Sequence, residues 1–203
     1  MLKKNLLLTI IFGGLIVLLL VGTRLGFVYA GGSGYQAPIV AHVVHGTGGT
    51  FARGSIVETQ VDEKLLLEIA GARVGLYENT SLELKMLSSD RIELKITKGR
   101  IAVAARSSNQ SITVSSNRVD ATTLGGSFSF VNYDFLQKVS IIPLSGIAGV
   151  VVNGESASIL AGPVDVSEIA PYELTETTFT PAGSAAEEFY TWFIDQRPAD
   201  IPE

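Results

Sequence analysis

Residues 92–103 read IELKITKGRIAV, and the spacing of apolar residues in this stretch indicates the class of fold. The apolar positions alternate with other residues on both sides of a glycine: Ile92, Leu94, Ile96, Ile101 and Val103. Alternation with a period of two places one set of side chains on a core face and the other in water, as in a half-buried strand. Lys98-Gly99 has residue types that are common in turns. The stretch therefore predicts two strands joined at Lys98-Gly99.

The same alternation recurs along residues 39–168. Further apolar pairs at this spacing are Ile112 and Val114, Phe128 and Phe130, and Val139 and Ile141. Turn-forming residues separate the runs at Glu78-Asn79, Ser88-Ser89-Asp90, Ser107-Ser108-Asn109, Asn132-Tyr133-Asp134 and Asn153-Gly154. Strands that recur about every 8 to 12 residues are typical of an all-β sandwich or barrel. The sequence therefore predicts an all-β domain over 39–168, an antiparallel β-sandwich or roll.

Two glycines precede one of these strands in the stretch LGGSFSF, residues 124–130. Glycine pairs often cradle phosphates, but a phosphate site needs several backbone N–H groups directed at one point, generally at a helix N-terminus. This region predicts strands, and no G-x-x-x-x-G-K-[ST] motif occurs in the chain. We therefore interpret Gly125 and Gly126 as the start of a strand, with Phe128 and Phe130 pointing into the core.

The N-terminal segment 1–30 contains an uncharged apolar run, residues 5–22, with Lys3 and Lys4 before it. A membrane-spanning helix needs about 17 to 25 apolar residues, whereas a signal peptide has a shorter apolar region and a small-x-small cleavage site. The run reaches the lower spanning limit, and a cleavage site follows at Ala30. Both alternatives, a transmembrane helix and a cleaved signal peptide, predict a cytoplasmic N-terminus and an exported body. Residues 31–38, GGSGYQAP, predict a flexible linker.

The composition excludes several classes of function. The chain has no cysteine, which excludes disulfides, thiol redox chemistry and thiolate metal sites. Its formal net charge is -5, and beyond Gly154 the only base is Arg197 among ten acids. An acidic surface does not favour nucleic acid or an anionic membrane. We therefore expect no nucleic-acid partner.

Residues 169–203 predict an acidic strap followed by an amphipathic helix. The strap is punctuated by prolines, and Ser184 with Glu187 three residues later forms a capping box that predicts the helix start. Pro198 predicts its end.

Phe189, Trp192 and Phe193 share one face of this predicted helix. One interpretation is that the aromatic stripe closes one end of the β core. The other is that it docks a protein partner, since Trp and Phe are common interface anchors.

No constellation of residues predicts catalysis or a cofactor. The two histidines, His42 and His45, lie three apart in a predicted strand and would point to opposite faces, which does not favour a shared metal ion. No G-x-S-x-G elbow is present. We therefore expect a protein that is not an enzyme and that holds no cofactor or metal.

The stretch from about Gly54 to Val152 resembles the FecR domain, a bacterial extracytoplasmic β module named after a regulator of iron-siderophore transport. The matching pieces are GSIVETQVDEKLLLEI, ARVGLYENTSLEL, IELKITKGRIAV, SITVSSNRVDATTLGGSFSF and VSIIPLSGIAGVVV. Within them, Asn79-Thr80 matches the Asn-Thr of the family, and Gly125-Gly126-Ser127-Phe128 stands where the family has Gly-Thr-x-Phe. The resemblance covers about half of the chain and implies the fold more strongly than a role.

The resemblance implies a membrane-tethered envelope protein whose domain, periplasmic or at the cell surface, binds a protein partner or scaffolds an assembly. An alternative is a module that binds cell-wall glycan, for which Tyr133 and Phe135 are the clustered aromatic candidates. A third alternative is a transmembrane regulator that contacts a sigma factor. The four residues that precede the apolar run argue against this third role.

Overall fold

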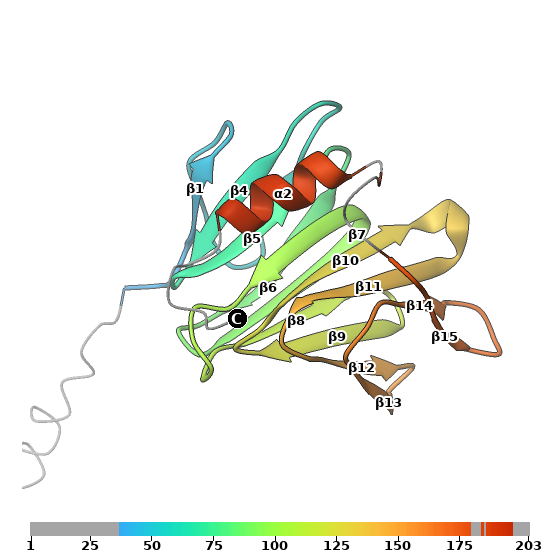
Figure 1. Cartoon of the computed structure of the whole chain (residues 1–203). Coiled ribbons are helices and arrows are strands. Elements are labelled where there is room, and N and C mark those ends of the chain that lie inside the picture. The colour runs from blue at the N-terminus through green and yellow to red at the C-terminus, as the bar shows by residue number, and fades with distance from the viewer. Residues whose placement is uncertain (1–36, 180–183, 185, 197–203) are drawn as a thin grey trace, which may run out of the picture. The chain divides into compact units, whose positions relative to one another are not determined.

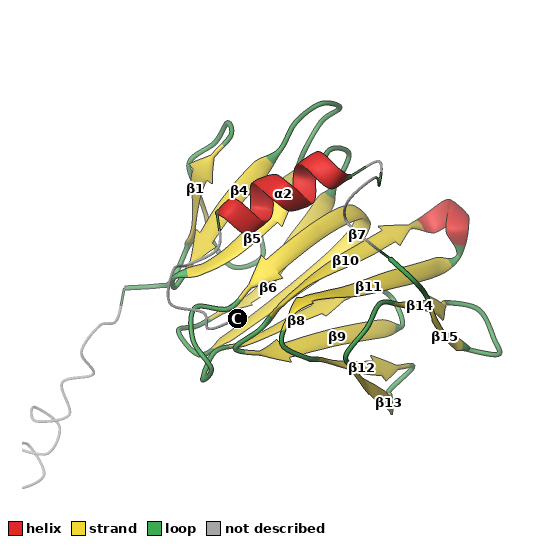
Figure 2. Cartoon of the chain, in the orientation of Figure 1, coloured by secondary structure: helices red, strands yellow, loops and turns green. Residues whose placement is uncertain are grey.

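The computed structural model describes residues 37–179, 184 and 186–196 (Figure 1). The predicted membrane or signal segment lies outside these residues. The predicted cleavage site after Ala30 and the predicted helix end at Pro198 also lie outside them. No helix within the described ranges is long and apolar enough to cross a bilayer. Within the described ranges, nearly all regular structure is strand, with one short α-helix towards the C-terminus (Figure 2). The prediction of a mostly antiparallel β domain followed by a short helix is confirmed.

The strands form two sheets that share one strand. Sheet A has the order β2 (Thr50–Phe51), β1 (Ala41–His45), β4 (Leu65–Ile69), β5 (Ala72–Leu76), β7 (Arg91–Ala104), β10 (Ser127–Tyr133), β11 (Lys138–Ser145), β14 (Val164–Ser167) and β15 (Leu174–Glu176). A 3₁₀ turn, η1 (Asp134–Leu136), joins β10 to β11. Sheet A thus continues past residue 168, where the sequence places the end of the β domain.

Sheet B has the order β3 (Ile56–Glu58), β6 (Ser81–Leu87), β7, β8 (Ser111–Ser115), β9 (Val119–Leu124), β12 (Ala148–Val152) and β13 (Glu155–Leu160). Its pairs are antiparallel except for β7 and β8, which run parallel with Arg91 opposite Ser111. This parallel pair is an exception to the predicted antiparallel arrangement. The loop before β8 is fixed by buried Gln110, whose side-chain amide donates to the carbonyls of Ala70 and Ser89.

The strand β7 is the stretch that predicted two strands, and it is a single strand of 14 residues. Its first half pairs with β6 in sheet B, and its second half pairs with β5 and β10 in sheet A. The predicted turn at Lys98-Gly99 is wrong: Ser81 pairs with Lys98 and Leu82 with Ile96, so the intervening Thr97 forms a bulge. A bulge bends a strand and shifts its alternation by one residue. This is why both Ile96 and Ile101 face the core.

Gly99 occupies the bend with a φ of +103°, and a Cβ there would lie 2.5 Å from the Cα of Thr80. The Oγ1 of Thr80 accepts a hydrogen bond from the N–H of Arg100 at 3.0 Å. Only glycine combines this backbone angle with so close an approach. Gly99 and Thr80 therefore hold the point at which β7 passes from one sheet to the other.

The two sheets enclose one hydrophobic cluster. Fully buried side chains from both sheets contribute to it, among them Leu84, Leu94, Val114, Phe128, Phe130 and Ile141. The prediction that Phe128 and Phe130 point into the core is confirmed. Gly125 has a φ of +70° and lies against Ser108, while Gly126 lies against the carbonyl of Ser145. These glycines lie directly before β10, as predicted, and they make close backbone contacts there.

The C-terminal helix α2 (Glu187–Asp195) packs on the outer face of sheet A, the face turned away from this cluster (Figure 1). It begins at Glu187 with Ala186 in the N-cap position, two residues later than the predicted N-cap Ser184. The N–H of Glu187 donates to the carbonyl of Ser184 at 3.0 Å. The helix thus covers the outside of one sheet, and the prediction that it closes an end of the β core placed it wrongly.

Candidate functional site

The helix contacts sheet A through a second hydrophobic cluster. Its buried members are Leu66, Ala102, Ala104, Val131, Ile142, Ala186, Phe189, Tyr190 and Phe193. The contact is close, since a Cβ on Gly75 of β5 would lie 2.6 Å from the Cδ2 of Phe193. The missing side chain at Gly75 therefore makes room for the ring of Phe193.

Of the three aromatic residues predicted to dock a partner, Phe189 and Phe193 are fully buried against this chain's own sheet. Trp192 is half-buried, and its ring centroid lies 5.4 Å from that of His45. It lines a shallow depression of about 650 Å³ together with Glu188, Thr191 and Asp195. Only Trp192 retains surface that a partner could touch.

Tyr190, which was not among the predicted site residues, connects the helix to the polar part of the sheet. The hydroxyl of Ser129 donates to the carbonyl of Ile101 at 2.8 Å, so the Tyr190 hydroxyl is the donor in its 3.2 Å bond to Ser129. Burial raises the pKa of Tyr190 above its ordinary value of 10.0, against the opposing effect of the Arg100 guanidinium. The fold thus holds Tyr190 as the neutral phenol.

Arg100 lies between two tyrosine rings. Its guanidinium carbon is 5.5 Å from the ring centroid of Tyr190 and 5.8 Å from that of Tyr77. Its Nε is buried and has no hydrogen-bond partner in the described residues, where no ion pair joins Arg100 to a carboxylate. A cation over aromatic faces is stabilised without being neutralised. Arg100 therefore keeps its positive charge available.

Arg100 also lines a pocket of about 330 Å³ on the outer face of sheet A, which we call the Arg100 pocket. The cross-strand row Arg100, Val131, Ser140 and Asp165 forms its floor. The other lining residues are Tyr133, Leu136, Lys138, Ile142, Thr177, Thr178 and Phe179.

The other two charged residues of this pocket, Lys138 and Asp165, form an ion pair with each other. Lys138 forms a 2.5 Å ion pair with Asp165, whose second carboxylate oxygen accepts from the hydroxyl of Ser140 at 2.5 Å. The described residues therefore leave the pocket with a net positive charge, carried by Arg100.

The two predicted glycan contacts lie together but face different surroundings. The ring centroids of Tyr133 and Phe135 are 5.7 Å apart. Tyr133 is half-buried and lines the Arg100 pocket, whereas Phe135 lies on η1 with 80% of its surface exposed. Only Tyr133 thus belongs to a concave site.

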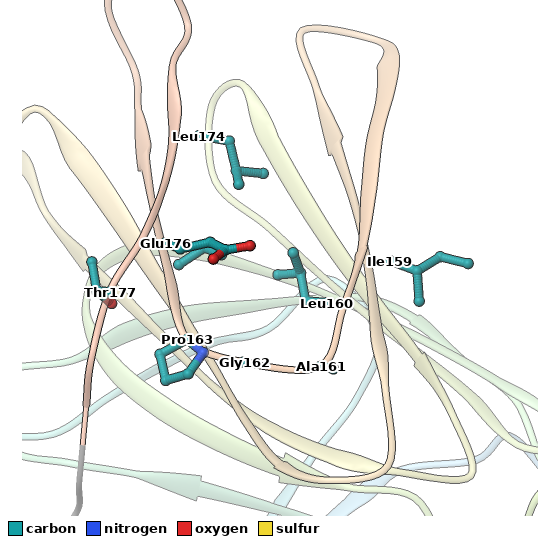
Figure 3. A pocket seen from close by; sticks show the side chains of 9 residues that line it. Ile159, Leu160, Ala161, Gly162, Pro163, Leu174, Glu176 and Thr177 are labelled. Atoms are coloured by element: carbon teal, nitrogen blue, oxygen red, sulfur yellow. The ribbon is translucent and has the colours of Figure 1, made fainter.

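A second candidate site lies where the two sheets end, beside the edge strand β13. A pocket of about 450 Å³, here called the Pro163 pocket, is lined by residues 159–164 together with Leu174, Glu176 and Thr177. Figure 3 shows Leu160, Leu174 and Glu176 converging on this space, whereas Ile159 points away from it. Ile159 is 75% exposed, although it is a large apolar side chain.

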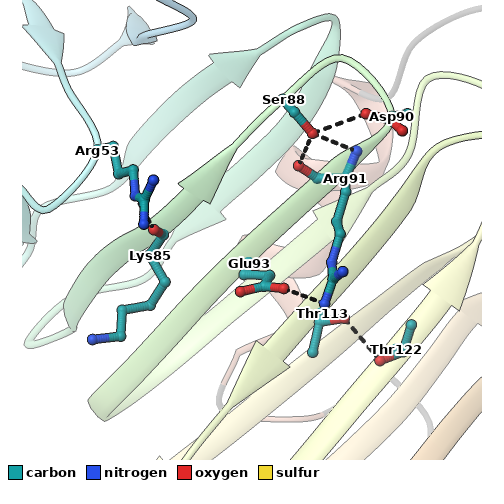
Figure 4. A network of polar contacts seen from close by, with 8 residues as sticks. All are labelled: Arg53, Lys85, Ser88, Asp90, Arg91, Glu93, Thr113 and Thr122. Atoms are coloured by element: carbon teal, nitrogen blue, oxygen red, sulfur yellow. Dashed lines mark hydrogen bonds and ion pairs between the residues drawn. The ribbon is translucent and has the colours of Figure 1, made fainter.

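The outer face of sheet B is polar and largely paired with itself (Figure 4). Arg91 forms a 2.5 Å ion pair with Glu93, and the hydroxyls of Thr113 and Thr122 lie 2.9 Å apart. The Nε of Arg53 donates to the carbonyl of Lys85 at 2.9 Å. This face presents polar groups that pair with one another.

Both histidines lie on β1 with exposed side chains, and Trp192 packs on His45. In the parts of the chain that the structure describes, no three His, Asp or Glu side chains gather in a way that could hold a metal ion.

Comparison with known proteins places the fold. No family model matches the sequence, and no curated relative does. Two crystal structures of a putative anti-sigma factor from Parabacteroides distasonis ATCC 8503, at 1.65 and 2.50 Å resolution, superimpose with TM-scores of 0.55 and 0.54. Each is 17% identical, and each match covers 68% of this chain and 64% of the other. The likeness shows a shared fold over slightly less than two thirds of that protein's length.

Proposed function

We propose that this chain is a non-enzymatic envelope protein, tethered by its apolar segment 5–22, whose FecR-like β domain lies outside the cytoplasm and binds a protein partner. The motifs of the FecR family and the fold shared with the Parabacteroides distasonis structures support the domain type. The observation that carries the binding role is the open edge of β13 beside the Pro163 pocket.

The edge of β13 can accept another strand. Among the described strands, β13 pairs only with β12, so the backbone groups on its other side have no strand partner. Natural proteins protect such edges with proline, charge, bulges or a covering element. The β13 segment ESASIL carries one charge, Glu155, and a shift of register against β12 between Val150 and Val151, but it has no proline, and its Ile159 is exposed. An edge with an exposed apolar residue and no strand on its other side suits the addition of a partner strand.

The surroundings of the edge define the chemistry of the partner. A strand added to β13 would continue sheet B, and its inward side chains would lie above Leu160, Pro163 and Leu174, which suits an apolar residue. Glu155 on the edge and Glu176 in the pocket are acidic, and no described residue beyond Gly154 is basic. We therefore take the occupant to be an extended segment of another protein, with an apolar residue flanked by lysine or arginine.

Photo-crosslinking identifies such a segment. A photo-reactive amino acid in place of Ala161, in the full chain in its native membrane, is expected to crosslink one extended segment with this pattern. A synthetic peptide of that segment is then titrated into two variants, Ile159→Lys and Ile56→Lys. Ile56 is 62% exposed on β3, the opposite edge of sheet B, and is the matched control.

The proposal predicts that Ile159→Lys weakens peptide binding about tenfold or more, because it adds a like charge and removes an apolar contact. Ile56→Lys is expected to leave the affinity unchanged. Crosslinks scattered over unrelated sequences, or an equal loss of affinity in both variants, would contradict binding at β13.

Regulation of a sigma factor is a second candidate function, because the Parabacteroides distasonis protein is described as a putative anti-sigma factor. In that role the partner strand at β13 would come from a protein outside the cytoplasm. Binding of that protein would change sigma-dependent transcription. A reporter of that transcription that responds to Ile159→Lys but not to Ile56→Lys would favour the regulator over a scaffold.

A further inference from the structure

The Arg100 pocket has the features of a binding site for a small anion. Its size of about 330 Å³ lies in the range of small-molecule sites. It is concave, and its floor is the rigid strand row described above, with the strap residues Thr177–Phe179 also lining it. A site built on paired strands holds its groups in fixed positions.

The anion is expected to be a carboxylate. The guanidinium of Arg100 presents planar paired donors that match the two oxygens of a carboxylate. Lys138 adds a second cation, although Asp165 neutralises it. Because Arg100 has no carboxylate partner in the described residues, a ligand carboxylate would supply the missing charge.

The remaining lining suits a hydroxylated ring. Tyr133 and Phe179 contribute aromatic surface, while Thr177 and Thr178 contribute side-chain hydroxyls that both donate and accept hydrogen bonds. The ammonium group of Lys138 has further donors besides the one directed at Asp165. A sugar ring offers both apolar C–H faces and hydroxyl groups to such a surface.

We propose that the Arg100 pocket binds a hexuronic acid, a six-carbon sugar that carries a carboxylate, with Arg100 on the carboxylate and Tyr133 on the ring. This site lies on the outer face of sheet A and does not use β13 or the Pro163 pocket. It is a ligand site in addition to the proposed protein contact, and either can fail without the other.

Calorimetric titration of the full chain tests this site with three probes: glucuronate, glucose and acetate. Glucuronate is expected to bind, whereas glucose lacks the carboxylate and acetate lacks the ring, so each should bind at least tenfold more weakly. No glucuronate binding at millimolar concentration would overturn the proposal. If glucose bound as tightly as glucuronate, recognition of the carboxylate by Arg100 would be refuted. If acetate bound as tightly as glucuronate, recognition of the sugar ring would be refuted.

Variants test the assignment of residues. Arg100→Gln is expected to weaken glucuronate binding about 10- to 100-fold, the usual effect of losing a hydrogen bond to a charged group. Arg53→Gln, on the outer face of sheet B, should have no effect. Tyr133→Ala gives an independent test because this residue lies outside the Arg100–Tyr190 contact, and thermal unfolding of each variant verifies the fold. Unchanged affinity in folded Arg100→Gln or Tyr133→Ala protein would refute the site.

Discussion

The guanidinium of Arg100 on β7 lies over the ring of Tyr190 on α2, with the guanidinium carbon 5.5 Å from the centre of the phenol ring. This contact joins the strand shared by both sheets to the helix that covers one of them. It also places the only unpaired cation of the Arg100 pocket, among the described residues, beside a buried tyrosine. The helix therefore stabilises the sheet and also shapes a polar site.

Tyr190 is expected to make stability depend on alkaline pH. Its folded pKa is raised above the value of about 10 in an unfolded chain, so the contribution of neutral Tyr190 is complete below pH 10 and is lost as the pH rises further. Urea unfolding at pH 8 and pH 11 measures this. At pH 8, Tyr190→Phe should lower the free energy of unfolding by about 1 kcal/mol, the value of its bond to Ser129.

At pH 11 the difference between Tyr190→Phe and the unaltered protein should shrink or reverse, because phenylalanine cannot ionise. A constant difference at both values would mean that Tyr190 titrates like an exposed tyrosine.

Phe193 and Trp192 are expected to differ in their effect on stability. Phe193 is fully buried against Gly75, so Phe193→Ala should lower the free energy of unfolding by about 3 to 5 kcal/mol. Trp192→Ala should have a smaller effect, because that ring is only half-buried. Chemical denaturation of the isolated protein compares them. Near-normal stability of Phe193→Ala would mean that the helix packs on a partner instead of on sheet A.

Gly99 allows the bend of β7, and its replacement can be compared with that of Gly54. Both have positive φ, but a Cβ at Gly54 meets nothing within 4 Å, whereas at Gly99 it collides with Thr80. Gly54→Ala should cost about 1 to 2 kcal/mol for the backbone angle alone. Gly99→Ala should cost about 1 to 3 kcal/mol more, the usual effect of overpacking. Equal losses of unfolding free energy would show that the approach to Thr80 is not tight.

A substitution of Phe128 tests the prediction that this residue points into the core from its strand. The ring is fully buried between the sheets, so Phe128→Ala should lower the free energy of unfolding by about 3 to 5 kcal/mol. Phe135→Ala, at an exposed ring, is the control and should change it by less than about 0.5 kcal/mol. If the two losses were similar, the orientation of β10 would be wrong.

The faces of the strands could be predicted from the sequence, but their partners could not. A period of two identifies the inward side chains of one strand, and Phe128, Phe130 and Ile141 are buried accordingly. Pairing depends on contacts between distant segments, which alternation does not encode. For this reason the parallel pair β7 and β8 was missed. The shift from even to odd apolar positions between Ile96 and Ile101 was the local signal of the bulge.

The candidate sites were only partly predictable. The helix buries Ala186, Phe189, Tyr190 and Phe193, a spacing of i, i+3, i+4 and i+7. The predicted aromatic stripe included Trp192 in place of Tyr190. The full spacing would have identified Tyr190. The Arg100 pocket could not be found in this way, because its residues come from β7, β10, η1, β11, β14 and the strap and meet only in the folded sheet.

Amide hydrogen exchange on β13 tests the proposed function most directly. The full chain is measured with and without the peptide identified by crosslinking, and exchange is followed for residues 155–160 of β13 and 56–58 of β3. Strand addition predicts that the peptide slows exchange in β13 and leaves β3 unchanged, because new backbone hydrogen bonds form only at the β13 edge. Unchanged exchange in β13 with the peptide bound would contradict the account.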